Sequence, residues 1–97
     1  MPKAYWINFF RKVNDPEKVA AYVKLAGPVM QAAGAKFLAR GEPAQVYEAG
    51  IKMRTVVIEF PSVEAAIKVH DSPGYQEALR ALGDGAERDL RIVPGVE

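Results

Sequence analysis

The order of strand-like and helical segments is the feature that most constrains the fold of this chain. Short stretches rich in β-branched and aromatic residues have strand character. Four such stretches are expected as strands, at residues 4–11, 35–40, 53–60 and 87–93. One helical segment separates the first two strands, and another separates the last two. This β-α-β-β-α-β order predicts a ferredoxin-like α+β fold with an antiparallel sheet, in a single domain of residues 1–97.

An Asp-Pro pair marks the expected start of the first helix. Asp15 can accept a backbone N–H as the N-cap, and Pro16 suits the first helical position. Apolar residues then recur at helical spacing from Val19 to Ala33, which is about four turns. Pro28 removes one backbone hydrogen bond and is expected to kink this helix, and Gly34 is expected to end it in a left-handed conformation.

The second helical region carries two start signals. Ser62 can cap a helix over residues 63–69. The Asp-Ser-Pro sequence at 71–73 repeats the cap-then-proline pattern and starts a further helical piece over residues 74–82. The region is therefore expected as two short helices joined near Asp71.

The connection between the second and third strands contains glycine and proline. Gly-Glu-Pro at 41–43 is expected to form a bulge, because proline cannot donate to a strand ladder. Residues 44–48 resume strand character in this interpretation, and Gly50 marks the hairpin turn.

Alternation along the strands predicts which side chains face the helices. Purely apolar sets are assigned to the helix side: Tyr5, Ile7 and Phe9 on the first strand, and Val56, Ile58 and Phe60 on the third. The opposite face then holds an apolar group and a polar group, namely Trp6, Phe10, Leu38, Val57 and Val93 with Asn8, Arg40, Thr55, Glu59 and Arg91.

Large apolar side chains on an uncovered sheet face need a partner. Burial of a Trp or Phe side chain contributes about 2–3 kcal/mol. A second copy laid face to face would recover that contribution for Trp6 and Phe10. We therefore expect a homodimer in which two sheets form a dimeric α/β barrel. The polar groups would line the space between the sheets, as in a ligand pocket.

Composition excludes several classes of function. The chain has no Cys and one His, which rules out disulfides, thiol catalysis and Cys-type zinc sites, so no metal and no cofactor are expected. Its 13 basic and 12 acidic residues are scattered, which argues against nucleic-acid binding. No apolar run is long enough to span a bilayer and no leader pattern is present, so no membrane association and a cytoplasmic location are expected.

Arg40 and Glu59 are the first pair of candidate site residues. They lie on strands expected to be neighbours, and the face assignment directs both into the space between the sheets. As a site, Arg40 would anchor a carboxylate and Glu59 would be a base with a raised pKa. In the structural interpretation, the two residues would form an interior ion pair that sets the register of the dimer.

Aromatic and polar residues provide further candidates. Trp6, Asn8 and Tyr75 could orient a planar ligand by stacking and hydrogen bonding, or simply pack at the dimer interface. His70 could be a general base or a haem ligand at the barrel mouth, whereas the structural interpretation, which we favour, is a surface His at a helix C-terminus. Glu59 and His70 are the two candidate catalytic bases.

Five segments together resemble a known family. They are AYWI at 4–7, FLARG at 37–41, VVIEFPS at 56–62, SPGYQEA at 72–78 and LRIVPGV at 90–96. In this order they are similar to the uncharacterised family numbered 1330 among the domains of unknown function. The resemblance implies a dimeric α/β barrel, in the same broad superfamily as antibiotic-biosynthesis monooxygenases, muconolactone isomerase and stress-responsive barrel proteins.

The sequence leaves three functions open. The first is binding of a small, partly apolar molecule, anionic near Arg40, in the space between the sheets. The second, which depends on superfamily analogy, is a cofactor-free oxygenase or isomerase acting on a small organic substrate. The third is a dimerising domain whose barrel is filled and binds nothing.

Overall fold

The computed structural model describes residues 2–96 and contains four strands and three helices. In chain order they are β1 (Ala4–Val13), α1 (Pro16–Ala32), β2 (Lys36–Gly41), β3 (Thr55–Phe60), α2 (Val63–His70), α3 (Pro73–Leu82) and β4 (Ala86–Pro94). The strands form one antiparallel sheet in the order β2-β3-β1-β4. The predicted ferredoxin-like α+β arrangement is thus confirmed. Within residues 2–96, no helix is long and apolar enough to cross a membrane.

The expected helix caps are present. The Asp15 side chain accepts hydrogen bonds from the backbone N–H groups of Glu17 and Lys18, and α1 then continues through Pro28. Gly34 follows the helix at φ 74°, a left-handed conformation that glycine adopts without steric cost. Ser62 accepts from the N–H of Ala65 at the start of α2. Because these caps satisfy otherwise unpaired backbone donors, they define where the helices begin.

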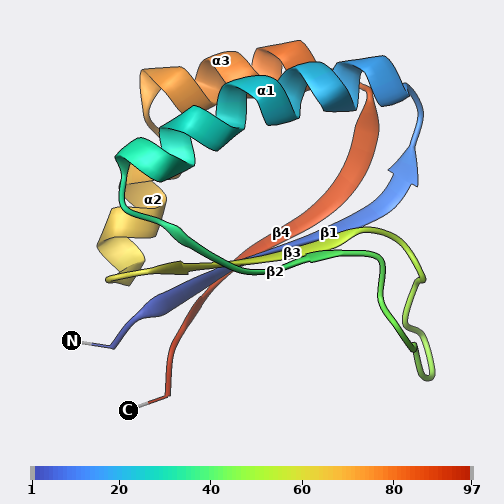
Figure 1. The fold of residues 1–97 in the computed structure, drawn as a ribbon, viewed down its shortest axis with the longest axis horizontal. Helices are drawn as coiled ribbons and strands as arrows, with labels where there is room; N and C mark the ends of the chain where they lie inside the picture. Colours follow the sequence, from blue (N-terminus) through green and yellow to red (C-terminus); the bar gives the residue numbers. More distant parts are fainter. Residues whose placement is uncertain (1, 97) are drawn as a thin grey trace.

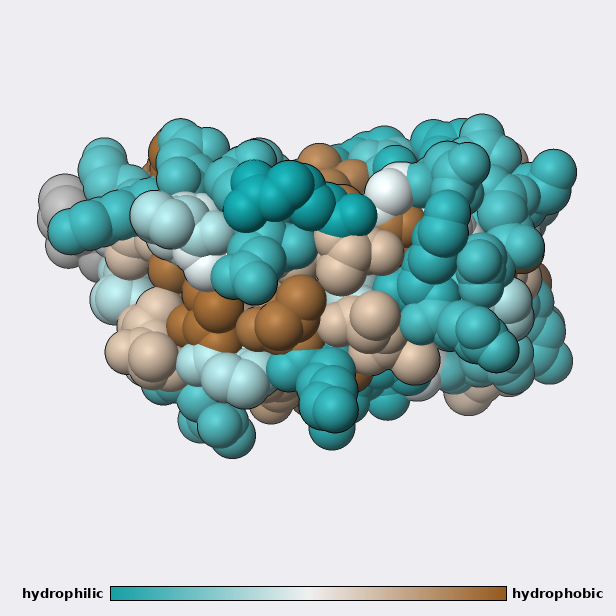
Figure 2. All heavy atoms as spheres, turned by 90° about the horizontal axis from the view of Figure 1, so that it is seen from above, coloured by the Kyte–Doolittle hydropathy of each residue, from teal (hydrophilic) through white to brown (hydrophobic). Residues whose placement is uncertain are grey.

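All three helices lie on one side of the sheet. α1 and α3 run side by side above it, α2 lies near one end, and no described element covers the opposite face, called the open face below (Figure 1). Seen from the helix side, the surface is largely hydrophilic with a small hydrophobic area near its middle (Figure 2). The helices therefore present polar surfaces to solvent and apolar surfaces to the sheet.

The face assignment of the first strand was wrong. On β1 it is Ala4, Trp6, Asn8 and Phe10 that are buried on the helix side. Trp6 lies opposite Ile58, and directly paired residues of antiparallel strands project to the same side of the sheet. The apolar set Tyr5, Ile7 and Phe9 consequently faces the open side. The assignment for Val56, Ile58 and Phe60 on β3 was correct, because all three are buried in the core.

Trp6 is the centre of the hydrophobic core. Only 1% of its surface is exposed. Its ring stacks on Phe60 with centroids 5.8 Å apart and meets Tyr75 edge-on at 5.1 Å. It thereby joins β1 to β3 and to α3. Alternation alone could not choose between two faces that both carry aromatic residues, and the space beneath the helices selected the side with the largest one.

The second strand also departs from expectation. A bulge lies at Leu38, between the pairs Phe37–Ile58 and Ala39–Val57, rather than at residues 41–43. The extra residue reverses the alternation, so Arg40 lies opposite Val56 on the helix side. The expected strand character at 44–48 is absent; these residues belong to a loop, residues 42–54, that descends past the open face (Figure 1).

We predict that Trp6→Ala destabilises the fold by about 3–5 kcal/mol, because it leaves a large cavity in the core. Chemical denaturation would measure this loss of unfolding free energy. Ile67→Ala on α2 is the control: Ile67 is 46% exposed, and its substitution is expected to change stability by only about 0.5 kcal/mol. Equal effects of the two substitutions would contradict the assignment of Trp6 to the core.

Candidate functional site

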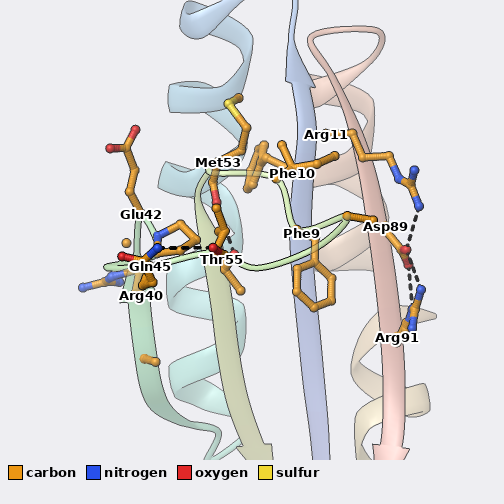
Figure 3. Close-up of a pocket in the computed structure, with 17 residues that line it drawn as sticks. Phe9, Phe10, Arg11, Arg40, Glu42, Gln45, Met53, Thr55, Asp89 and Arg91 are labelled. Carbon is orange, nitrogen blue, oxygen red and sulfur yellow. Dashed lines mark hydrogen bonds and ion pairs between the residues drawn. The ribbon is translucent and has the colours of Figure 1, made fainter.

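A large hollow lies where the open face meets the loop 42–54. This open-face concavity has a volume of about 770 Å³. Phe9, Thr55, Asp89 and Arg91 contribute from the sheet, and the loop supplies the outer wall (Figure 3). A volume in this range is typical of sites for small organic molecules.

Two arginines and one aspartate form the polar side of this concavity. Arg11 donates to Asp89 Oδ2 at 3.0 Å, and Arg91 donates to both oxygens of the same carboxylate at 2.9 and 3.0 Å (Figure 3). The hydrogen bonds from Arg91 and then from Arg11 lower the pKa of Asp89. One carboxylate neutralises only one of the two guanidinium groups, so this cluster keeps a positive charge.

Apolar side chains line the concavity between this cluster and its far side, where Arg40, Glu42 and Gln45 lie (Figure 3). Phe9 projects from β1 and is 38% exposed, and Ile51 of the loop is 49% exposed. Met53 and Val46 complete this wall, and the Thr55 hydroxyl donates to the Met53 carbonyl at 3.2 Å, which ties the end of the loop to β3. The concavity therefore offers an apolar surface beside a cationic one.

The predicted Arg40–Glu59 pair does not form, because the bulge at Leu38 separates the two residues onto opposite faces. Glu59 lies on the open side, opposite Tyr5, and pairs with Lys3 at 3.5 Å between Nζ and Oε2. The Arg40 guanidinium instead lies 5.1 Å from the centroid of the Phe37 ring. Arg40 is the one predicted ligand-binding residue that lines the open-face concavity.

Three predicted ligand-binding residues meet at a second place, inside the chain. Trp6, Asn8 and Arg40 all line a narrow cavity of about 60 Å³ between α1 and the sheet, called the internal cavity below. These residues therefore do come together, but on the helix side of the sheet, which the sequence interpretation did not expect.

Tyr75, expected at a ligand or interface position, is completely buried in a polar cluster that the sequence analysis missed. Its hydroxyl lies 2.7 Å from that of Tyr22, and Arg88 donates to the Tyr22 hydroxyl at 3.0 Å. The Arg88 guanidinium also lies 4.6 Å from the centroid of the Tyr22 ring, a cation–π contact. Strand alternation could have predicted this position, because Arg88 alternates with Leu90 and Ile92 and so shares their helix-facing side.

His70 is the last residue of α2, as expected, and 35% of its side chain is exposed. Its Nδ1 lies 3.0 Å from Asp71 Oδ1, as two adjacent residues at the end of α2 allow. Its ring lies 5.9 Å from that of Trp6 and 5.3 Å from that of Tyr75, measured between centroids. His70 thus closes one end of the aromatic core, and it lines neither the open-face concavity nor the internal cavity.

We predict that the buried Tyr75 makes the protein less stable at high pH. Burial, reinforced by the adjacent Tyr22, raises the pKa of Tyr75 above its ordinary value of 10.0. Unfolding at high pH therefore releases a proton, and the free energy of unfolding falls as pH rises above the unfolded-state pKa of about 10. Denaturation between about pH 9 and pH 11 should show a smaller decline for Tyr75→Phe than for the unsubstituted chain. Identical pH profiles would contradict this assignment.

Solved structures from several organisms share the fold. A protein of unknown function from Rhodopseudomonas palustris is 21% identical, with a TM-score of 0.77 over 99% of this chain and 84% of that one. SnoaB, a cofactor-independent oxygenase from Streptomyces nogalater, is 12% identical, with a TM-score of 0.67 over 100% and 96%. A dimeric ferredoxin-like protein of unknown function from Thermobifida fusca is 18% identical, with a TM-score of 0.63 over 96% and 91%.

At these identities the likeness concerns the fold alone. No curated protein matches the chain significantly. The family described as Domain of unknown function (DUF1330), in contrast, matches residues 3–96, almost the whole length. The family resemblance inferred from the five sequence segments is thereby confirmed, and the chain belongs to the DUF1330 family.

Proposed function

We propose that this chain is a homodimeric binding protein for a small, partly apolar anion, held in the open-face concavity between two facing sheets. The observation that carries the proposal is the composition of that concavity, which joins an apolar wall to a cationic cluster on an uncovered face.

The open face carries more apolar surface than is usual for a sheet face exposed to water. Apolar side chains from three strands project there, namely Tyr5, Ile7, Phe9, Val57 and Val93. Phe9 and Val93 are 38% and 41% exposed. A second copy of the same face would remove this surface from water at about 25 cal/mol per Å². The structure from Thermobifida fusca, with the same fold, is described as dimeric, which supports this arrangement.

The charges of the concavity favour an anion. Arg11, Arg40 and Arg91 line it together with Glu42 and Asp89, so three positive side chains oppose two negative ones and leave an excess of one positive charge. Guanidinium groups bind carboxylates and phosphates in a planar, bidentate manner. A carboxylate with an apolar body would satisfy both sides of the concavity.

A cofactor-free oxygenase or isomerase ranks second. SnoaB shares the fold and is described as a cofactor-independent oxygenase, which supports this alternative. Such chemistry needs a base near the substrate. The two predicted bases, Glu59 and His70, do not line the open-face concavity, so its geometry supports binding more than proton transfer.

Ile7→Lys should abolish the dimer. Ile7 lies in the middle of the open face, opposite Val57 and Arg91. An ammonium group there would have to be desolvated between the two sheets beside a guanidinium group of like charge, which is costly. Sedimentation at low micromolar concentration is expected to give twice the monomer mass for the unsubstituted chain and the monomer mass for the variant.

The matched control for dimerisation is Ile67→Lys, which places the same charge on the exposed side of α2 and should leave the dimer intact. Circular dichroism would establish that both variants keep the fold. A monomeric unsubstituted chain, or a dimer that tolerates Ile7→Lys, would refute the open-face interface.

For the ligand, benzoate and 4-phenylbutanoate are suitable probes, with the neutral benzamide as the comparison. Calorimetry should detect binding of the two acids and much weaker binding of benzamide. Arg91→Gln removes a charged donor and is expected to weaken acid binding about tenfold. Arg80→Gln, on the exposed side of α3, is the control and should have no effect. Benzamide that binds as tightly as benzoate would contradict the anion site.

A further inference from the structure

Strand β4 lies at one edge of the sheet, so one side of its backbone has no neighbouring strand. Gly95, directly after the strand, donates its N–H to the carbonyl of Lys3 on the other side at 2.6 Å. In an antiparallel pair, alternate residues direct both backbone groups to the neighbour. Odd-numbered residues of β4 therefore face β1, whereas Leu90 and Ile92 direct their N–H and C=O groups away from the sheet.

The free edge of β4 is continuous. Bulges and prolines commonly protect edge strands from pairing with another chain. The opposite edge strand, β2, has a bulge at Leu38. On β4 the pairing with β1 runs without an extra residue from Arg88 to Pro94, and this proline is the last residue of the strand. The backbone of β4 can therefore accept a further strand, and its side chains determine which strand fits.

An apolar hollow lies between α2 and β4. Ile67 and His70 of α2 line it together with Leu90 and Ile92, and its volume is about 310 Å³. The Ile67 residue is 46% exposed. A strand added beside β4 would place its own helix-side residues next to Leu90 and Ile92. An apolar residue at this level would remove part of the exposed surface from water.

The charges of β4 select a second copy of β4 as the added strand. Free backbone groups must meet one another, so the self-pairs with the longest overlap are centred on Asp89, Leu90 or Arg91. The first centre opposes two aspartates and the last opposes two arginines, and like charges directly opposite each other are unfavourable. The centre at Leu90 overlaps the whole strand and sets Asp89 of each copy opposite Arg91 of the other.

We propose that β4 pairs antiparallel with β4 of a second copy, with Leu90 at the two-fold axis. The sheets of the two chains then join into one continuous sheet. On the helix side, the two Leu90 side chains meet beside the hollow. On the open face, Asp89 lies between Arg91 of its own chain, which donates to it at 2.9 Å, and Arg91 of the second copy. This contact uses a different surface from the face-to-face dimer and does not depend on it.

Disulfide cross-linking tests this register, because the chain has no Cys of its own. In the proposed pair the two Leu90 Cα atoms are about 5.5 Å apart, a separation that a disulfide can span. Full-length Leu90→Cys should therefore form a covalent dimer under mild oxidation at high micromolar concentration. Ile92→Cys is the matched control, since Ile92 is also half-buried on the helix side of β4. Its Cα atoms would be about 14 Å apart, so cross-linking should be about tenfold slower.

The cross-link distinguishes edge pairing from the face-to-face dimer. Leu90 lies opposite Asn8, which is buried on the helix side. Packing of two open faces would therefore place the two Leu90 residues on the outer sides of both sheets, too far apart for a disulfide. A denaturing gel without reductant reads only the covalent product, because the face-to-face dimer dissociates on it.

Exchange of the two charges tests whether the second copy is the partner. In the Leu90→Cys chain, Asp89→Arg sets an arginine opposite Arg91 and should slow cross-linking about tenfold. Adding Arg91→Asp restores opposite charges, so the rate should recover. Circular dichroism checks the fold of each variant. Should the exchanged variants fail to fold, sedimentation of the unsubstituted chain decides: the mass should double between low micromolar and millimolar concentration.

Several results would overturn the edge pair. Equal rates for Leu90→Cys and Ile92→Cys would refute the register, as would a rate that does not recover in the folded charge-exchanged chain. Absence of cross-linking in both variants, or a mass that does not rise with concentration, would refute the pairing itself. Failure of the function proposed for the open face has a different signature: the monomer mass at low micromolar concentration together with intact cross-linking of Leu90→Cys.

Discussion

The packing of Trp6 between the sheet and the helices is the constraint on which the arrangement of the strands and helices depends. The indole contacts Phe60 on the neighbouring strand, Tyr75 on α3 and His70 at the end of α2. A side chain of this size can be enclosed only where two layers meet. Once Trp6 occupies that space, strand alternation places Asn8 and Phe10 on the same side and directs Ile7 to the other.

Strand β1 thus separates two chemical environments. On its open side, apolar residues border a large concavity that Arg11, Arg40, Arg91, Glu42 and Asp89 also line. On its helix side, Asn8 lines a small cavity beneath α1, and its side-chain oxygen is buried without a hydrogen-bond partner. The two hollows differ in volume, about 770 Å³ against about 60 Å³, and in the polar groups that line them. Arg40, on the edge strand next to the bulge, borders both.

The cluster of Tyr22, Tyr75 and Arg88 shows how a charge is tolerated in the helix–sheet layer. Arg88 comes from β4, and the two tyrosines come from α1 and α3, so the hydrogen bonds among them join three elements. The hydroxyl oxygens and the face of the Tyr22 ring replace water around the guanidinium group. The cluster also borders the internal cavity through Tyr22 and so helps to hold its inner wall in place.

The amino-acid sequence by itself determined the element order, the helix caps at Asp15 and Ser62, and the family, because these depend on local chemistry and on motifs read along the chain. It also selected Trp6, Asn8 and Arg40, which the fold brings together. Only the tertiary structure decided on which side of the sheet they meet. Both faces of β1 carry aromatic residues, so periodicity is ambiguous there, and a one-residue bulge at Leu38 reverses the direction of Arg40. Such choices depend on volume and register across strands, which no local pattern encodes.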